Sequence, residues 1–424
     1  MNKNKYIPQG YKDSPLGIIP NEWEVKRLGE LFSFKNGVNA SKDSYGEGVK
    51  FVNTMDVLNN AFLTGNIIRG KISINEKTKN EFLVKFGDVL FNRTSETREE
   101  IGCSTVYLDN EETVFGGFVI RAHDLDKSIL DVKYKQYCFQ PLYIRNQVSA
   151  LGNGAIRYNI GQEDLSKACI LIPTKKEQKA IVSCIGLWDT AIEKQSELIA
   201  KLKLRKHALM QQLLTGKKRL PGFSGEWKEV KLGDIFDERN ETKCNDLPLL
   251  SITGDKGVIY QSESDKRDIS NDDKSKYKRI CPNDIGYNTM RMWQGRSALS
   301  NIEGIVSPAY TIVTPHKNVD VRFMAMLIQQ PRVVYDFWTH SQGLVSDTLN
   351  CKYPDFCQVK VRIPSKEEQT AIADLLYEFD KEINLANEKL ANLQSQKRGL
   401  MQQLLTGKKR IKELKDYEKR RKQA

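Results

Sequence analysis

One stretch of eleven residues, LMQQLLTGKKR, occurs twice in this chain of 424 residues, at 209–219 and again at 400–410. The similarity extends backwards without gaps, so that residues 172–208 align with 363–399 at the same offset of 191. A second similarity, at an offset of 204, pairs EWEVKRLGELF at 22–32 with EWKEVKLGDIF at 226–236. Self-similarity at a long fixed spacing indicates a duplicated structural unit. The sequence therefore predicts the order module, helical repeat, module, helical repeat.

Both repeats are predicted to be long helices. Each follows an Ile-Pro pair, and proline is tolerated in the first turn of a helix. Apolar residues then recur at steps of four and three, which is the heptad pattern of a coiled coil. The heptad positions are Trp188, Ile192, Gln195, Ile199, Leu202, Lys206, Leu209 and Leu213 in the first copy, and Phe379, Ile383, Ala386, Leu390, Leu393, Lys397, Leu400 and Leu404 in the second. Each helix is expected to end at Thr-Gly, with Gly216 or Gly407 as its C-cap.

The two helices are expected to pair with each other. About forty residues at ~1.5 Å each make a rod of roughly 60 Å. An intramolecular antiparallel coiled coil would relate the two modules by a pseudo-twofold axis. Lysine at the same heptad position in both copies, Lys206 and Lys397, would disfavour misregistered pairing. Packing of each helix on its own module, or a coil between two copies of the chain, are the alternatives.

The fold class is predicted as α+β, with two globular α/β-type domains joined by the two long helices. In the first module, strand-like segments at 49–58, 87–94, 103–108 and 113–123 precede a helical stretch at 132–151. The second module repeats this order at 247–253, 283–290, 307–315 and 323–343. The predicted division is a first domain at 1–171, a helical region at 172–220, a second domain at 221–362, and a second helical region with a basic tail at 363–424.

The charge is concentrated at the ends of the two helical regions. The net charge is +12 and the pI is near 9.1. Residues 201–219 carry seven Lys or Arg and no acid, and residues 408–424 carry nine against three acids, so these two stretches account for the whole excess. The rest of the chain must therefore contact nucleic acid, if it does so, through locally placed basic side chains. The basic ends suit either phosphate contact or docking of partner proteins, and an identical doubled segment favours two identical partners.

Several classes of protein are disfavoured. No apolar run approaches the ~18–20 residues of a membrane span, and the two lysines near the N-terminus precede no apolar segment typical of a secretory signal. The eight cysteines form no C-x-x-C pair, which favours reduced and mostly buried thiols in a cytoplasmic protein over zinc or disulfide sites. The sequence contains no Pro-Pro pair for an adenine-methyltransferase loop and no P-loop. These absences favour a protein that recognises a partner and carries no catalytic site.

The chain resembles the specificity subunit of a type I restriction–modification system over nearly its full length. The resemblance rests on LFNRTSETREEIG at 90–102, NTMRMWQGRSALSNIEGIVSPAYTI at 288–312, the paired IP-[TS]-K-x-EQ-x-AI helix starts, and the doubled QQLLTGKKR. It implies two target recognition domains that each read one half of a bipartite asymmetric sequence in double-stranded DNA. It also implies two conserved helical regions that fix the spacing and dock two methyltransferase subunits. Restriction and translocase subunits would join through that complex.

The same resemblance implies that S-adenosylmethionine, ATP and Mg belong to the partner subunits and that this chain binds no cofactor. Two alternatives remain. The chain could serve a smaller system in which methyltransferase and nuclease are fused, or it could be a coiled-coil adaptor that binds proteins and no DNA.

Candidate DNA-contacting residues are polar side chains in loops that follow predicted strands. Arginine can pair with guanine, Asn or Gln with adenine, and Ser or Thr with either. In the first module the candidates are Asn92, Arg93, Thr94, Ser95, Thr97, Arg157 and Tyr158; in the second they are Thr289, Arg291, Gln294, Arg296 and Ser346. Arginines in such loops also often pair with nearby acids, and Glu96 and Glu99 lie close to Arg93 in the sequence. Trp293 is expected to anchor its loop, and Trp23 and Trp227 are expected to be structural.

Overall fold

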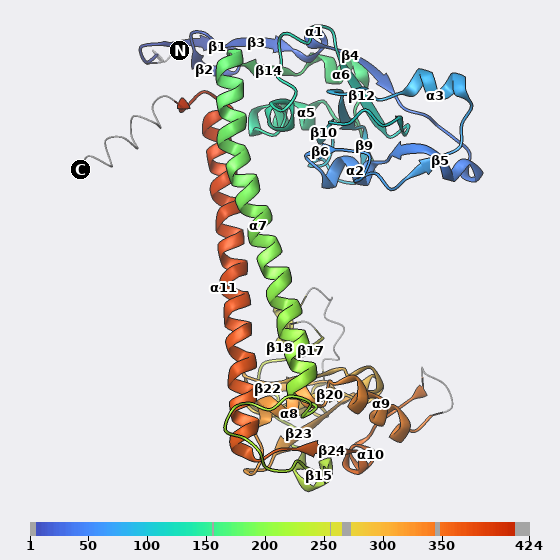
Figure 1. Cartoon of the computed structure of the whole chain (residues 1–424), viewed down its shortest axis with the longest axis vertical. Helices are drawn as coiled ribbons and strands as arrows, with labels where there is room; N and C mark the ends of the chain where they lie inside the picture. The colour runs from blue at the N-terminus through green and yellow to red at the C-terminus, as the bar shows by residue number, and fades with distance from the viewer. Residues whose placement is uncertain (1–5, 155–156, 255, 265–272, 344–347, 412–424) are drawn as a thin grey trace. The chain divides into compact units, whose positions relative to one another are not determined.

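The computed structural model describes residues 6–154, 157–254, 256–264, 273–343 and 348–411. By their contacts these residues fall into two compact units. Unit 1 comprises Met1–Lys194 with Lys389–Ala424, and unit 2 comprises Gln195–Glu388. Two helices of 39 residues, α7 (Lys175–Leu213) and α11 (Lys366–Leu404), each begin in one unit and end in the other. Their lengths confirm the predicted long helices (Figure 1). The four-part division with boundaries at 171, 220 and 362 stays a prediction.

The centre of unit 1 is a five-stranded sheet flanked by smaller sheets and short helices. Its order is β4-β12-β8-β10-β6, with β4 Phe32–Asn36, β12 Val119–Asp124, β8 Val89–Asn92, β10 Ser104–Tyr107 and β6 Phe62–Leu63. A three-stranded sheet contains β11 (Thr113–Phe115), β5 (Tyr45–Val52) and β7 (Lys71–Ile72). Three two-stranded sheets complete the unit: β1 (Tyr11–Ser14) with β2 (Gly17–Pro20), β3 (Glu24–Arg27) with β14 (Cys169–Ile172), and β9 (Thr94–Ser95) with β13 (Tyr158–Asn159). The short helices are α1 (Leu28–Leu31), α2 (Thr54–Asn59), α3 (Glu76–Phe82), α4 (Lys135–Cys138), α5 (Leu142–Leu151) and α6 (Gln162–Lys167).

Unit 2 repeats the first four strands in the order of the main sheet of unit 1. Its main sheet has the order β16-β23-β20-β21, with β16 Phe236–Arg239, β23 Tyr310–Pro315, β20 Ile285–Asn288 and β21 Ser297–Leu299. Two-stranded sheets pair β15 (Lys228–Lys231) with β24 (Lys360–Ile363), β17 (Leu250–Thr253) with β18 (Gly257–Tyr260), and β19 (Lys278–Ile280) with β22 (Gly304–Val306). The helices are α8 (Val321–Leu327), α9 (Pro331–His340) and α10 (Tyr353–Gln358). The matching sheet orders support the duplication predicted from the sequence.

Two predicted elements are shorter than expected, for identifiable reasons. The strand predicted at 49–58 stops at Val52, because the Asn53 side chain accepts from the Asp56 N–H and Asp56 returns the bond, which forms a capping box and starts α2. The helical stretch predicted at 132–151 is two helices, α4 and α5, since Pro141 precedes the first residue of α5. Proline disfavours helical geometry in the residue before it.

The predicted heptad positions form the seam between α7 and α11. Ile199, Leu202, Leu213, Phe379, Ile383 and Leu404 are buried, and Trp188, Ile192, Leu209, Leu390, Leu393 and Leu400 are half-buried. Within unit 2 the seam also contains the buried Gln195, whose Nε2 donates to the Ala386 carbonyl at 2.9 Å. A polar group inside a seam favours one register at some cost in stability.

The two seam lysines form ion pairs that are each other's repeat equivalents. Lys206 on α7 binds Asp380 on α11 in unit 2 at 2.5 Å, and Lys397 on α11 binds Asp189 on α7 in unit 1. Asp189 and Asp380 are 191 residues apart, as are the two lysines. Each pair therefore joins the first helix to the second, and within each unit the helices are antiparallel, as predicted. The lysines support the register by attraction to these aspartates.

The ends of the helix pair are built into the domain cores. In unit 1 the core contains Ile181 and Ile185 of α7 together with Met401 and Leu404 of α11. In unit 2 the core likewise contains residues from the end of α7 and the start of α11, namely Leu213, Leu214, Ile372, Ala373 and Leu376. Gly216 and Gly407, with φ of 70° and 69°, take the left-handed conformation expected of C-caps. The predicted structural role of Trp23 and Trp227 is confirmed by their burial in these cores.

Equivalent polar residues attach each domain to its helices. Gln178 at the start of α7 accepts from the Asp131 N–H and donates to the Pro173 carbonyl. Its counterpart in α11, Gln369, accepts from the Asp320 N–H and donates to the Pro364 carbonyl. These bonds satisfy buried backbone groups at the two junctions, where a domain meets the start of one long helix and the end of the other. Each domain is therefore fixed to its own helix start in the same way.

All eight cysteines are free thiols, but only Cys138 and Cys351 are fully buried and the other six are partly exposed. Burial raises the pKa of both buried thiols. No helix in the described part of the chain is long and apolar enough to cross a bilayer.

Candidate nucleic-acid interface

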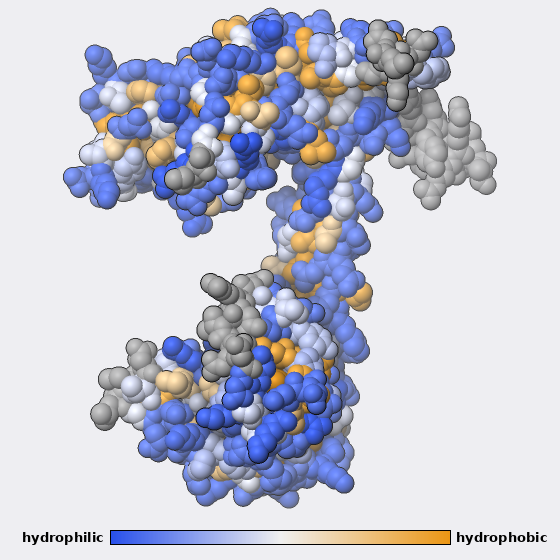
Figure 2. Space-filling view, turned by 180° about the vertical axis from the view of Figure 1, so that it is seen from behind, coloured by the Kyte–Doolittle hydropathy of each residue, from blue (hydrophilic) through white to orange (hydrophobic). Residues whose placement is uncertain are grey.

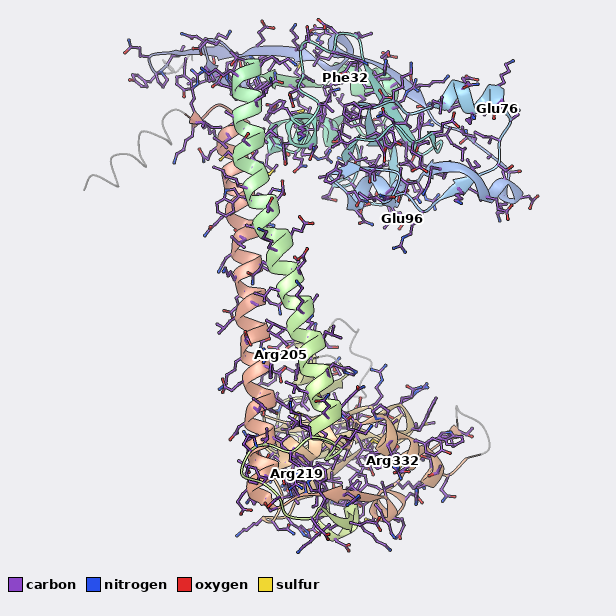
Figure 3. All side chains as sticks on the ribbon, in the orientation of Figure 1. Phe32, Glu76, Glu96, Arg205, Arg219 and Arg332 are labelled. Carbon is purple, nitrogen blue, oxygen red and sulfur yellow. The ribbon has the colours of Figure 1, made fainter. Side chains whose placement is uncertain are left out.

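The two loops predicted separately in the first module lie side by side in unit 1. Strand β9 in the first loop pairs antiparallel with β13 in the second, so that Tyr158 faces Ser95 and Asn159 faces Thr94. The Ile160 N–H donates to the Arg93 carbonyl at 3.0 Å and extends this pairing. Figure 3 shows Glu96 on a loop at the edge of the unit. The backbone pairing therefore gathers the candidates of residues 92–97 with those of 157–158.

Two of these candidates are buried and hold the loop in place. Asn92 has no exposed surface, and its Nδ2 donates to the Glu100 carbonyl at 3.0 Å. Ser95 is 7% exposed, and its hydroxyl binds the Glu100 carboxylate and accepts from the Thr97 N–H. Both side chains are enclosed and bonded within the loop, so direct contact of Asn92 and Ser95 with DNA stays a prediction that their burial does not favour. They are positioning residues.

Arg93 and Thr94 are half-buried and already have partners. Arg93 Nη1 donates to the Gly117 carbonyl at 3.2 Å, and Thr94 donates to Asn159 Oδ1 at 2.5 Å. Among the described residues, Arg93 has no ion pair with Glu96 or Glu99, the acids that its position in the sequence suggested. Its remaining guanidinium donors stay available at the edge of the loop.

Thr97, Arg157 and Tyr158 complete the predicted set in unit 1. Thr97 and Arg157 are exposed, and Arg157 lies 4.0 Å from Glu96 with both side chains mostly in solvent. An exposed pair of this kind contributes little to stability, so a phosphate or base could displace Glu96. The Arg98 guanidinium lies 5.0 Å from the centre of the Tyr158 ring, which orients the phenol at the loop surface.

The corresponding loop of unit 2 is a rigid turn between β20 and β21. Met292 is fully buried in the core, Trp293 donates to the Met290 carbonyl, and Gly295 adopts φ 73° after a single 3-10 turn. The Asn288 N–H donates to the Arg296 carbonyl at 3.0 Å and closes the base of the turn. The anchoring role predicted for Trp293 is supported by this bond. Met292 points into the core, whereas the side chains of Arg291, Gln294 and Arg296 are exposed to solvent. Thr289 is half-buried.

These three exposed side chains line a cavity of about 570 Å³. Its other wall comes from the β17–β18 hairpin and from the start of β23. The lining residues are Ile252, Thr253, Gly254, Lys256, Ile259, Ser264, Asn288, Arg291, Gln294, Arg296, Ser297 and Tyr310. Three of them are cationic and none is a carboxylate. Sequence reasoning missed the hairpin wall, since the hairpin at 250–260 is remote in sequence from the predicted loop at 288–296.

A cavity of about 550 Å³ occupies the matching place in unit 1, after β5 and beside the turn that enters β12. It is lined by Val38, Asn39, Ala40, Tyr45, Phe51, Asn53, Thr54, Met55, Gly116, Gly117, Phe118 and Val119. None of these is charged, and Phe118 is 62% exposed. The Phe118 carbonyl accepts from the Arg93 N–H, so this neutral cavity adjoins the predicted loop. The Gly-Gly-Phe turn was the available signal in the sequence.

Residues at both ends of the segment that contains the candidate Ser346 are tied to the same loop. Gln342 pairs with Asn350 by two backbone bonds, and the Cys351 N–H donates to the Thr289 carbonyl at 2.8 Å. This bond corresponds to the one between Ile160 and Arg93 in unit 1. Ser346 lies outside the described residues.

The residues predicted as partner-docking or coil positions serve the coil. They are buried or half-buried between the helices, so a docking role for these side chains stays a prediction. Leu187, Leu204 and Leu385 are 73%, 70% and 65% exposed, and Figure 2 shows hydrophobic patches along the helix pair. In the doubled segment, Lys217, Lys218, Lys408 and Lys409 are exposed. Arg219 and Arg410 instead pair with Glu368 and Glu177 inside the junctions.

No group of three or more His, Cys, Asp or Glu side chains comes together among the described residues in a way that could hold an ion. The polar loops, the cavities beside them and the exposed lysines described above suit recognition of a macromolecule.

Comparison with known proteins identifies a family. The model described as "Type I restriction modification DNA specificity domain" matches residues 20–204 and 224–395. The type I restriction enzyme MjaVIII specificity subunit of Methanocaldococcus jannaschii is 21% identical over 439 residues, which covers 96% of this chain and 98% of the relative.

Two solved structures share the fold. A chain solved in a study of complex assembly and conformational transition of the type I R-M system has a TM-score of 0.58 at 17% identity and covers 92% of this chain and 99% of its own. The S subunit of a type I restriction–modification system from M. genitalium has a TM-score of 0.50 at 16% identity, with 90% and 96% covered.

Proposed function

Because the chain belongs to the type I restriction–modification DNA specificity family, and so is a non-catalytic DNA-recognition subunit, we propose that unit 1 reads one half of a bipartite target and unit 2 reads the other. The helix pair is proposed to set the spacer between the halves and to dock two methyltransferase subunits. Adenine methylation follows in those partners, which also supply the sites for S-adenosylmethionine, while ATP and Mg serve the restriction subunits.

The observation that carries this proposal is the contrast between the junctions and the loops. At the junctions, repeat-equivalent residues make equivalent contacts: Glu177 with Arg410 and Glu368 with Arg219. In the loops, corresponding positions differ, for example Arg93 in unit 1 and Thr289 in unit 2, whose backbone carbonyls accept equivalent bonds. Similar junctions suit two copies of one partner, and different loops suit two different half-sites.

Methylation mapping tests the proposal. The chain is expressed with its methyltransferase in a host, and long-read sequencing identifies the methylated bipartite motif. Substitution of Gln294 by Ala in the unit 2 loop is expected to relax one half of the motif and to leave the other half and the spacer unchanged. A matched substitution in unit 1, Arg157→Ala, should relax the opposite half. If both variants altered the same half, the assignment of one half-site to each unit would be wrong.

A coiled-coil adaptor that binds no DNA is not favoured, given the family match. Service in a system with a fused methyltransferase–nuclease is the second candidate. Co-purification distinguishes it from the first, since the partner would then be one long polypeptide with both activities instead of separate methyltransferase and restriction subunits.

A further inference from the structure

The two arginines that line the unit 2 cavity, Arg291 and Arg296, have no carboxylate partner among the described residues, whereas some other arginines of the unit do. Arg239 donates to Asp284 at 2.7 Å, which raises the pKa of its guanidinium, and Arg322 donates to Asp320 at 2.7 Å. Arg291 and Arg296, in contrast, make no ion pair with any residue that the structure describes. Both side chains are exposed. Cations left unpaired on a rigid loop are ready for an external acceptor.

The Arg296 side chain has a defined place in the cavity. A Cβ added to Gly254 would lie 2.3 Å from Arg296 Nη1, so the guanidinium packs directly against the backbone at the end of β17. The hairpin turn beneath it is closed by the Thr253 hydroxyl, which donates to the Gly257 carbonyl and accepts from the Lys256 N–H. The planar guanidinium of an arginine at this wall can make two parallel hydrogen bonds to one flat acceptor edge, which a point contact with a phosphate does not need.

We propose that the cavity between the β17–β18 hairpin and the 291–296 turn receives the edge of a guanine, with Arg296 as the residue that reads its N7 and O6 and Gly254 as the residue that positions the guanidinium. Guanine is the base whose major-groove edge offers two adjacent acceptors. The half-site read by unit 2 therefore contains an obligatory guanine. The cavity of unit 1 has no cation among its described lining residues, and Arg93 reaches its edge only through the Gly117 carbonyl, so Arg296 has no counterpart on that wall. The inference rests on the proposed function and adds the base to it.

The experiment uses the chain in complex with its methyltransferase subunits and duplexes of the mapped target. Each guanine of both half-sites is replaced in turn by 7-deazaguanine, which lacks the N7 acceptor, and affinity is measured by fluorescence anisotropy. For the wild type, one replacement in one half-site is expected to weaken binding about tenfold, in line with the loss of part of a bidentate contact. In Arg296→Ala the same replacement should have no effect.

Two further variants separate base reading from charge. Gly254→Ala keeps every charge but displaces the guanidinium, and it is tolerable for folding because the atom it meets is the end of a flexible side chain. It should lose most of the 7-deazaguanine effect while the salt dependence of binding stays at the wild-type slope. Arg332→Ala, an exposed arginine of the same unit on α9 (Figure 3), is the matched control and should retain the full effect.

Other outcomes would overturn the inference. If Arg296→Ala weakened binding to all sequences equally and lowered the salt slope by about one, Arg296 would be a phosphate contact. Persistence of the 7-deazaguanine effect in Arg296→Ala, or a motif without guanine in the unit 2 half, would also exclude it. A wild-type complex with no sequence preference at all would instead contradict the proposed function.

Discussion

The ion pair between Arg219 and Glu368 gives a quantitative test of how the helices are attached to unit 2. Arg219 follows the end of α7, and Glu368 lies in the first turn of α11; Figure 3 labels Arg219 at this junction. Nε and Nη2 of Arg219 each donate to one carboxylate oxygen, both at 2.5 Å, and the Glu368 side chain is only 2% exposed. The bidentate bond raises the pKa of the Arg219 guanidinium. The variant Glu368→Gln keeps the volume but turns an amide N–H₂ toward the guanidinium.

The expected loss follows from burial. Removing one partner of a buried pair costs about 3–5 kcal/mol, and since Arg219 is 27% exposed water recovers part of it, so about 3 kcal/mol is expected. That corresponds to roughly a 150-fold faster opening, at one factor of ten for each ~1.4 kcal/mol. The repeat-equivalent variant Glu177→Gln is the internal control. Its side chain is 19% exposed and Arg410 retains Glu22 at 2.9 Å, so about 1 kcal/mol is expected.

Hydrogen exchange with mass spectrometry measures both losses, because it reports local opening peptide by peptide. Glu368→Gln should accelerate exchange at the start of α11 and in β15 and β24, and leave the unit 1 peptides at their wild-type rates. Glu177→Gln should act in unit 1 and by a much smaller factor. Equal effects of the two variants, or no acceleration by Glu368→Gln, would refute the reasoning that burial and the absence of a second carboxylate beside Arg219 determine the energy of these pairs.

Three further predictions concern the loops, the helices and the thiols. Asn92→Ala removes the bond to the Glu100 carbonyl and should lower the free energy of unfolding by about 1–2 kcal/mol, which urea denaturation measures. An unchanged salt dependence of DNA binding in this variant would confirm that Asn92 contacts no phosphate. Four residues inserted into α7, about 6 Å of helix, should change the spacer of the methylated motif and preserve both half-sites, and an unchanged spacer would rule out a helix pair that acts as a ruler. Burial raises the pKa of Cys351 to about 12, so at pH 8 this thiol should stay protonated and resist iodoacetamide until the protein unfolds, whereas early labelling of Cys351, seen by peptide mass mapping, would contradict its burial.

The helices were predictable because a heptad is a one-dimensional pattern. The positions from Trp188 to Leu213 and from Phe379 to Leu404 could be read from spacing alone, and the structure places all of them in the seam. The partners of Lys206 and Lys397 were less visible, because Asp189 and Asp380 resemble ordinary solvent-facing acids until an antiparallel register is fixed. Once it is, the shared offset of 191 residues places both aspartates at equivalent positions opposite the two lysines.

The loops were predictable in place but not in orientation. Strand β8 is buried at every position, from Val89 to Asn92, so the alternation that normally separates inward from outward residues does not apply to it. Asn92 and Arg93 are neighbours in the sequence, yet one is enclosed and the other reaches the edge. The wall that Gly254 contributes to the unit 2 cavity depends on a hairpin remote in sequence, and no local pattern encodes such a contact.

The doubled eleven residues are alike in sequence but not in surroundings. The copy at 400–410 meets an N-terminal hairpin in unit 1: the Tyr11 hydroxyl donates to the Gly407 carbonyl, and a Cβ on Gly407 would lie 2.5 Å from Pro20. The copy at 209–219 has Trp227 against Gly216, and among the described residues the indole N–H of Trp227 has no partner, whereas that of Trp23 donates to Glu177. Because Gly407 is buried and Gly216 is not, two identical partners would meet the same exposed lysines on differently covered ends. The affinities of the two copies for the same partner should therefore differ. The copy at 209–219 is the less covered of the two, because Gly216 is only half-buried.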